Sequence, residues 1–167
     1  MMINQNNIKN KSKEISLRRI TRRNYREIIR LRVKPEQRSL IASNAVSMAD
    51  ASFYRDAWMR AIYLGEKPIG FVMLGDSTLK YKILKPIKPY LYVWRFMIAG
   101  RYQGKGYGKK AMDKIIVHVK TKLNAKELLI YTLPQNINAI GFYKHLGFKP
   151  TGKKLAFGDL ELRLELE

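Results

Sequence analysis

A glycine-rich segment between a predicted strand and a predicted helix is the part of this sequence best suited to bind an anion. It reads Gln103-Gly104-Lys105-Gly106-Tyr107-Gly108. Three glycines allow the backbone to turn tightly and to approach a ligand closely. The helix that follows begins with free N–H groups and the positive end of its dipole, an arrangement that favours phosphate. Further positive charge at this end comes from Arg101, Lys105, Lys109 and Lys110.

Two common phosphate-binding motifs do not fit this segment. A Walker loop requires a glycine where the sequence has Gln103 and a serine or threonine where it has Lys110. A dinucleotide-binding fingerprint requires a third glycine where the sequence has Lys109. Taken alone, the segment fits a simple connection between strand and helix as well as it fits a ligand site.

A second motif about thirty residues later changes this balance. It reads Asn136-x-x-Ala139-x-x-Phe142-Tyr143-x-x-Leu146-Gly147-Phe148. In this order, the two segments resemble the Q/R-x-x-G-x-G/A loop and the N-x-x-A-x-x-[LF]-Y-x-x-x-G-F helix of the GNAT superfamily of acyl-CoA-dependent N-acetyltransferases. The resemblance implies an α/β (α+β) fold, with a central, mixed, mostly antiparallel sheet that is splayed at a bulge and has helices on both faces.

Three shorter stretches resemble one bacterial branch of that superfamily, the spermine/spermidine or diamine acetyltransferases. They are Leu31–Gln37, the stretch from Ala42 to Ala49, and Trp94–Ile98. The branch implies acetyl transfer to a primary amine, with a polyamine such as spermidine or spermine as one acceptor. Because the chain has no cysteine to hold an acetyl group, we expect direct attack in a ternary complex. An amine of a protein or of an aminoglycoside is the alternative acceptor.

The resemblance also implies roles for individual residues. Acetyl-CoA is the expected cofactor, with its pyrophosphate on the N–H groups of Gly104 to Gly108 and its pantetheine arm along Phe96 to Ile98. Asn136 matches a position that bonds this arm, and Tyr143 matches the general acid that protonates the departing thiolate. The residues expected to bind the cofactor are Phe96, Met97, Ile98, Gln103, Gly104, Lys105, Gly106, Tyr107, Gly108, Lys109, Asn136 and Tyr143.

The base that deprotonates the acceptor is not evident. An ammonium has no lone pair, so a base is needed before or during attack. Many members of the superfamily carry a carboxylate on or just after the central strand, but here that strand, residues 90–98, has none. Candidate acids on other elements are Glu36, Asp50, Asp56 and Asp76. His118 and His145 are expected to be structural.

Hydrophobic spacing predicts the elements that hold these residues. Strands are expected at 15–17, 58–64, 68–74, 90–98 and 127–133, followed by a hairpin of 155–157 with 160–166. Helices are expected after Thr21, in pieces over 36–56 with Ser47 and Asp50 as a capping box, over 108–123, and over 136–145. This order predicts helices packed on a sheet. We expect a flexible tail over 1–13 and a single domain over 14–167.

Composition excludes several kinds of site. With no cysteine and two histidines in 167 residues, neither a disulfide framework nor a metal centre is expected. No apolar run reaches about 18 residues, so we expect no membrane association and a cytoplasmic location.

The net charge of +20 supports a second function class. Residues 1–38 carry 12 basic and 3 acidic side chains, and aromatic residues lie among the lysines of 80–92. A basic chain attracts polyanions, so a non-enzymatic nucleic-acid-binding module is the alternative. It is not favoured, because the basic residues are dispersed and no RNP, KH or zinc signature occurs. The expected partner is a small-molecule amine acceptor, and a homodimer stays open.

Overall fold

The computed structural model describes residues 14–54, 57–76, 91–155 and 158–166. Its elements follow the predicted order of strand, helices, three strands, helix, strand, helix and hairpin. They are β1 (Ile15–Arg18), α2 (Tyr25–Arg30), η1 (Pro35–Gln37), α3 (Asn44–Ser52), β2 (Trp58–Leu64), β3 (Lys67–Asp76), β4 (Leu91–Ile98), η2 (Gly100–Tyr102), α5 (Tyr107–Lys122), β5 (Glu127–Thr132), α6 (Ile137–His145), β6 (Lys149–Lys154) and β7 (Leu160–Glu165). The tail predicted over 1–13 lies outside the described residues.

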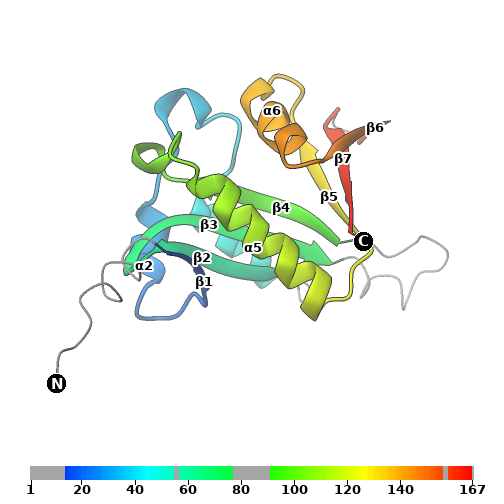
Figure 1. Ribbon diagram of the computed structural model, residues 1–167. Helices are drawn as coiled ribbons and strands as arrows, with labels where there is room; N and C mark the ends of the chain where they lie inside the picture. Colours follow the sequence, from blue (N-terminus) through cyan, green and yellow to red (C-terminus); the bar gives the residue numbers. More distant parts are fainter. Residues whose placement is uncertain (1–13, 55–56, 77–90, 156–157, 167) are drawn as a thin grey trace.

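The strands form one seven-stranded sheet in the order β1-β2-β3-β4-β5-β7-β6 (Figure 1). Neighbouring strands are antiparallel except for β4 and β5, which run parallel. The sheet is therefore mixed and mostly antiparallel, as predicted. Within the described part of the chain, no helix is long and apolar enough to cross a membrane.

The sheet opens between its two parallel strands. β4 and β5 pair only at Tyr92 with Leu129 and at Val93 with Ile130. On its other side, β4 changes register against β3 at Trp94, because Arg95 lies opposite Met73 whereas Val93 lies opposite Leu74. This extra residue is a β-bulge. Residues 94–98 of β4 therefore have no strand partner on the β5 side, which confirms the splay predicted at a bulge.

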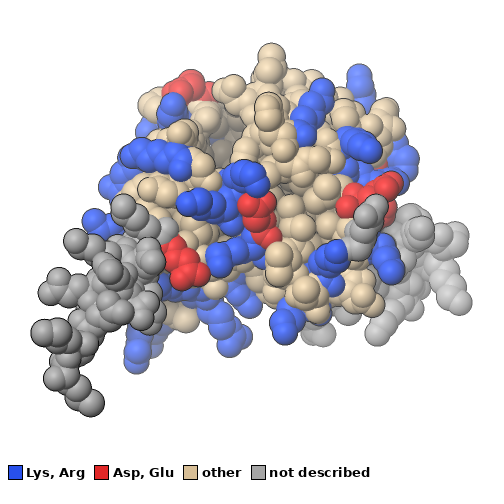
Figure 2. Space-filling model, viewed as in Figure 1, with Lys and Arg blue, Asp and Glu red and all other residues tan. Residues whose placement is uncertain are grey.

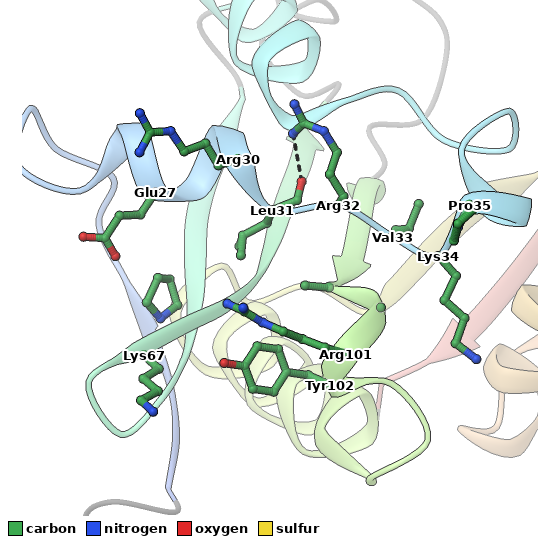
Figure 3. A pocket seen from close by; sticks show the side chains of 13 residues that line it. Glu27, Arg30, Leu31, Arg32, Val33, Lys34, Pro35, Lys67, Arg101 and Tyr102 are labelled. Atoms are coloured by element: carbon green, nitrogen blue, oxygen red, sulfur yellow. Dashed lines mark hydrogen bonds between the residues drawn. The ribbon is translucent and has the colours of Figure 1, made fainter.

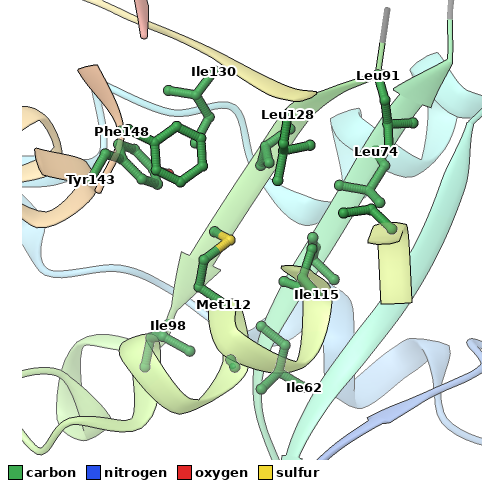
Figure 4. Packing of buried hydrophobic residues seen from close by; sticks show 14 of the residues in the cluster. Ile62, Leu74, Leu91, Ile98, Met112, Ile115, Leu128, Ile130, Tyr143 and Phe148 are labelled. Carbon is green, nitrogen blue, oxygen red and sulfur yellow. The ribbon is translucent and has the colours of Figure 1, made fainter. Parts of the chain in front are cut away.

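Helices cover both faces of the sheet, as predicted. On one face, Met112 and Ile115 of α5 are fully buried against side chains of the sheet and of α6 (Figure 4). On the other face, Ile28 of α2 and Ala51 of α3 pack against Phe71 and its neighbours. These helices bury the named apolar residues against the sheet, and this burial of apolar surface holds both layers in place.

Two predicted helix starts are wrong in detail. The N-cap of α3 is Ser43, whose hydroxyl accepts a hydrogen bond from the Val46 N–H at 3.2 Å. Ser47 lies inside this helix, and its hydroxyl donates to the Ser43 carbonyl at 3.0 Å. Thr21 does not cap α2, because its hydroxyl accepts from the Arg23 N–H within a preceding turn.

The first strand of the C-terminal hairpin was placed too late in the sequence. It is β6, which covers 149–154, and residues 156–157 lie outside the described part. β6 is an edge strand with mostly exposed side chains, so its sequence carries no apolar alternation that could reveal it. Leu123, the last residue of the helix predicted over 108–123, is the C-cap of α5 and is exposed.

Candidate active site

The glycine-rich segment forms a left-handed turn at the start of α5. Gly104 and Gly106 have φ values of 73° and 76°, and Gly106 is the N-cap of the helix. A Cβ atom added at either glycine would meet no heavy atom within 4 Å. Backbone conformation rather than crowding therefore requires glycine here. The turn borders open space with the N–H groups of the first helical turn beside it.

A cavity of about 510 Å³ lies against this turn. Ten of the twelve residues predicted to bind the cofactor line it: Phe96, Met97, Ile98, Gln103, Gly104, Gly106, Gly108, Lys109, Asn136 and Tyr143. The other two do not. Lys105 is exposed on the turn, and Tyr107 packs against the core beneath α5. The segment between α2 and α3 supplies the remaining wall, for example with Leu40 and Ile41.

Gln103 ties the turn to two other walls of the cavity. Its side-chain amide nitrogen donates to the Ile98 carbonyl at 2.9 Å and to the Gln37 side-chain oxygen at 2.8 Å. The Gln37 oxygen also accepts from the Lys34 backbone N–H at 3.3 Å. The end of β4, the glycine-rich turn and η1 are thus held together by one partly buried network.

Close packing joins the start of α5 to α6. A Cβ atom at Gly108 would lie 3.4 Å from the Phe142 ring, which is an ordinary van der Waals contact, so the two helices lie close together here without requiring a glycine. The Phe142 ring also stacks on Phe96 of β4, with centroids 5.9 Å apart. Lys109 lies on the next position, where its ammonium is 3.0 Å from the Asp113 carboxylate.

A second cavity of about 530 Å³ lies between β4 and β5 and is lined by residues of both strands. The two cavities share six lining residues: Leu40, Ile41, Phe96, Asn136, Ala139 and Tyr143. Trp94, Thr132 and Asp159 line only the second one. The two cavities, which we call the first and the second chamber, are therefore adjacent and meet beside Phe96, Asn136 and Tyr143.

Tyr143 lies where the two chambers meet. Its ring is 8% exposed and makes edge contacts with Phe142 and Phe148, at centroid distances of 5.1 and 5.7 Å. Burial raises the pKa of its phenol well above the usual value. The hydroxyl is therefore protonated at neutral pH and can donate a proton or a hydrogen bond. Asn136, also at the junction, caps α6 by accepting from the Ala139 N–H at 3.3 Å.

Of the four acids suggested by the sequence, the two whose side chains the structure describes, Glu36 and Asp50, do not line either chamber. Glu36 is exposed on η1, and Asp50 lies 3.9 Å from the Arg95 guanidinium beneath α3. Asp56 and the side chain of Asp76 lie outside the described part. The acid that does line the second chamber is Asp159, which the sequence analysis missed. Its only signal was a Gly-Asp pair, which is equally typical of a plain turn.

Neither histidine lines these chambers. The His118 ring stacks on Trp58 with centroids 4.5 Å apart. His145 lies at the end of α6, and its Nδ1 is 2.8 Å from the Gly141 carbonyl oxygen. Their contacts agree with the expectation that both are structural.

A third, basic cavity of about 830 Å³ adjoins the first one at Val33 and Lys34. Its basic lining residues come from three segments, and Glu27 is the one acid among its lining residues (Figure 3). They are Arg30, Arg32, Lys34, Lys67 and Arg101. Lys and Arg side chains are also scattered over the face in Figure 2, with few acids between them. This distribution attracts anions toward the chambers.

Known proteins share both this sequence pattern and this architecture. Residues 48–148 match the Acetyltransferase (GNAT) family. A spermine/spermidine N(1)-acetyltransferase of Bacillus subtilis is 31% identical over 142 residues, which are 83% of this chain and 90% of that protein.

Solved structures show the same fold at lower identity. A spermidine N-acetyltransferase of Vibrio cholerae, in complex with CoA and spermine, superposes with a TM-score of 0.69 at 16% identity and covers 91% of this chain and 95% of its own. An acetyltransferase of Thermus thermophilus gives 0.70 at 16% identity, covering 93% and 99%. The family match spans more than half of the chain, and the separated parallel strands, the glycine turn and the aligned elements agree with it. The chain therefore belongs to the GNAT family of acetyltransferases.

Proposed function

We propose that this N-acetyltransferase transfers the acetyl group of acetyl-CoA to a primary amine of a polyamine such as spermidine or spermine. The observation that carries the proposal is the pair of adjoining chambers where β4 and β5 separate: the first borders the glycine turn and a helix N-terminus, and the second is lined by Asp159. The sequence relative supports the acceptor class, because it is a spermine/spermidine acetyltransferase.

The residues of the first chamber suit the donor. Acetyl-CoA supplies an acetyl thioester that is already activated toward amines. Gly104 and Gly106 leave space for a diphosphate beside the N–H groups of α5, where the helix dipole favours negative charge. Backbone groups of 96–98 that face the β5 side, where β4 has no strand partner, are suited to pair with an extended amide-containing arm, except for the Ile98 carbonyl, which accepts from Gln103.

The residues at the junction suit the transfer step. In our proposal, the acceptor amine attacks the thioester carbonyl directly, and a β4 N–H near the bulge polarises that carbonyl. As the C–N bond forms and the C–S bond breaks, Tyr143 donates its phenolic proton toward the leaving sulfur, and the proton released by the amine returns to the phenol through solvent. Burial keeps the phenol in its acid form at neutral pH, so it can donate a hydrogen bond that strengthens as negative charge develops on the sulfur.

The test is an acetyl-CoA consumption assay over a panel of amines. The panel contains spermidine, spermine, short diamines, aminoglycosides and lysine peptides. We expect the largest kcat/KM for a polyamine or a diamine. A larger value for the lysine peptides or the aminoglycosides would assign the enzyme to the alternative acceptors.

The basic cavity is the observation that supports the alternative function, a nucleic-acid-binding module. Five basic side chains with a single acid would bind phosphates in a salt-dependent way. RNA binding that weakens steeply with salt, together with no response to acetyl-CoA, would favour a binding module over an enzyme. Acetyl-CoA turnover with any amine of the panel would favour an enzyme over a binding module.

A further inference from the structure

The second chamber contains a carboxylate that lacks a partner. Asp159 lies in the turn before β7, and its Oδ1 atom is buried without a hydrogen-bond partner in the described structure. Burying such an oxygen is costly unless a donor reaches it. Because Asp159 lines the chamber, a ligand bound there can supply this donor.

Two basic side chains, Arg38 and Arg95, line the same chamber, but neither forms a hydrogen bond or ion pair with Asp159 in the described structure. Arg95 is closest to Asp50, at 3.9 Å. Burial lowers the pKa of Arg95, and the charges of Asp50 and, more weakly, Asp159 oppose this shift. Arg38 is exposed, where solvent screens its charge. The Arg95 guanidinium interacts with the charge of Asp159, and its Nε is also buried without a partner. Because neither arginine donates to Asp159 Oδ1 in the described structure, this oxygen stays open to a cationic donor of the ligand.

The position of Asp159 separates it from the site of the reaction. Tyr143 and Phe96 line both chambers, so the thioester and the amine are expected to meet beside them. Asp159 lines only the second chamber, beyond this junction, together with the indole of Trp94. In our proposal, a cation held at Asp159 is a part of the acceptor other than the nitrogen that reacts beside Tyr143. The half-buried Trp94 ring offers an apolar surface to the methylene groups between the bound cation and the reacting nitrogen of the acceptor.

We propose that Asp159 binds a second, non-reacting ammonium group of the acceptor and so makes the enzyme selective for diamines and polyamines over monoamines. This inference rests on the proposed function, because it takes the second chamber as the acceptor site. A hydrogen bond between a carboxylate and an ammonium is among the stronger polar interactions in a partly desolvated site. One carboxylate at a fixed place selects acceptors by the spacing of their nitrogens.

The test compares 1,4-diaminobutane with 1-aminobutane, which lacks only the second nitrogen. We expect Asp159→Asn to lower kcat/KM for the diamine by roughly tenfold to a hundredfold, mainly through KM, as for the loss of a charged hydrogen bond. The value for 1-aminobutane should stay within about twofold of wild type. Glu165→Gln is the matched control, because it removes an exposed carboxylate from β7 and should keep the diamine preference. Asp159→Glu retains the charge and should also keep much of it.

A second measurement does not depend on turnover. Calorimetric titration of 1,4-diaminobutane into the CoA-loaded protein should show binding that weakens at least about tenfold in Asp159→Asn. An unchanged diamine preference and unchanged diamine binding in this variant would overturn the proposal. So would an equal loss of kcat for both amines, because Asp159 would then act at the reacting nitrogen. If the wild-type protein binds CoA but acetylates no amine, the proposed function fails, and the titration still decides the role of Asp159.

Discussion

The side-chain amide of Gln103 donates a 2.8 Å hydrogen bond to the side-chain oxygen of Gln37, across 66 residues of sequence. Gln103 begins the glycine-rich turn, whereas Gln37 ends η1 on the opposite wall of the cofactor chamber. The bond therefore sets the position of the turn relative to the wall that faces it. Since the same nitrogen also donates to the end of β4, loss of Gln37 weakens the network without removing it.

We expect Gln37→Ala to weaken CoA binding by about three- to tenfold, which corresponds to one hydrogen bond of ordinary strength. The check is a double-mutant cycle with Gln103→Ala, with the Kd of CoA measured by calorimetry. The effect of Gln37→Ala should shrink when Gln103 is already absent, because the two residues act through one bond. Strictly additive effects would show that this bond does not position the turn.

Gly106 tests the conformation of the turn. An alanine at φ 76° costs roughly 1–2 kcal/mol in the left-handed region, although the added methyl group meets no neighbour. We expect Gly106→Ala to shift the turn and raise the Kd of CoA by about tenfold. Gly152→Ala is a matched control, because Gly152 has a φ of 80° and equally open surroundings on the β6 edge. That variant should lose similar stability and keep normal CoA binding, so equal Kd values in the two variants contradict the assignment of the turn.

Tyr143→Phe removes the proposed proton donor and leaves the ring packing in place. We expect kcat to fall by roughly a hundredfold or more, in the range typical of general-acid catalysis, with the Kd of CoA within about twofold of wild type. Tyr25→Phe on α2 is the control, because Tyr25 lines neither chamber. This variant should behave as wild type. Stopped-flow measurement of thiol release reports the step directly. Turnover at the wild-type rate in Tyr143→Phe would exclude the role of the phenol.

The pH dependence of kcat should reflect the same residue. Burial raises the pKa of the Tyr143 phenol, so its acid form persists at and beyond pH 10, where an ordinary tyrosine ionises. We therefore expect the rate to rise with pH as the acceptor loses its proton, without a decline between pH 8 and about pH 10 caused by the phenol. The profile is measured with a saturating diamine. A decline centred near pH 8 would indicate a different proton donor.

His118 makes stability depend on pH. Burial, and then the charges of Arg60 and Lys122, lower the pKa of its imidazole below the ordinary value. Below about pH 6.5 the unfolded chain binds this proton more readily than the folded one, so stability falls as the pH falls. We expect Tm to drop between about pH 6.5 and pH 5, and to drop less in His118→Phe, which keeps a ring on Trp58. His145→Phe, at the exposed end of α6, is the control, and an identical loss of slope in both variants would exclude His118 as the cause.

The sequence predicted the elements that carry strong periodicity or a motif. The helix now seen as α5 and the buried strands β2, β3 and β5 have clear apolar spacing, and the glycine turn and α6 lie where the two motifs placed them. Gly104 and Gly106 could be found because positive φ demands glycine, which is visible in a sequence.

The parts that escaped prediction depend on contacts between distant segments. β6 is an exposed edge strand whose sequence carries no periodicity. Gln37 and Gln103 meet only after the segment between α2 and α3 has folded over the end of β4. Asp159 enters the second chamber because the hairpin of β6 and β7 packs beside β5. None of these encounters leaves a local pattern in the chain.

The short contact between β4 and β5 has a consequence for the degradation of the protein. Through the sheet, the block of β1 to β4 and the block of β5, β7 and β6 share only two residue pairs. Acetyl-CoA bonded to both blocks would take the place of the hydrogen bonds that β4 and β5 do not form with each other. A ligand that binds only the folded state stabilises that state by mass action. The resistance of the enzyme to proteolysis would then depend on the concentration of acetyl-CoA. A low concentration of acetyl-CoA would shorten the lifetime of the enzyme that consumes it.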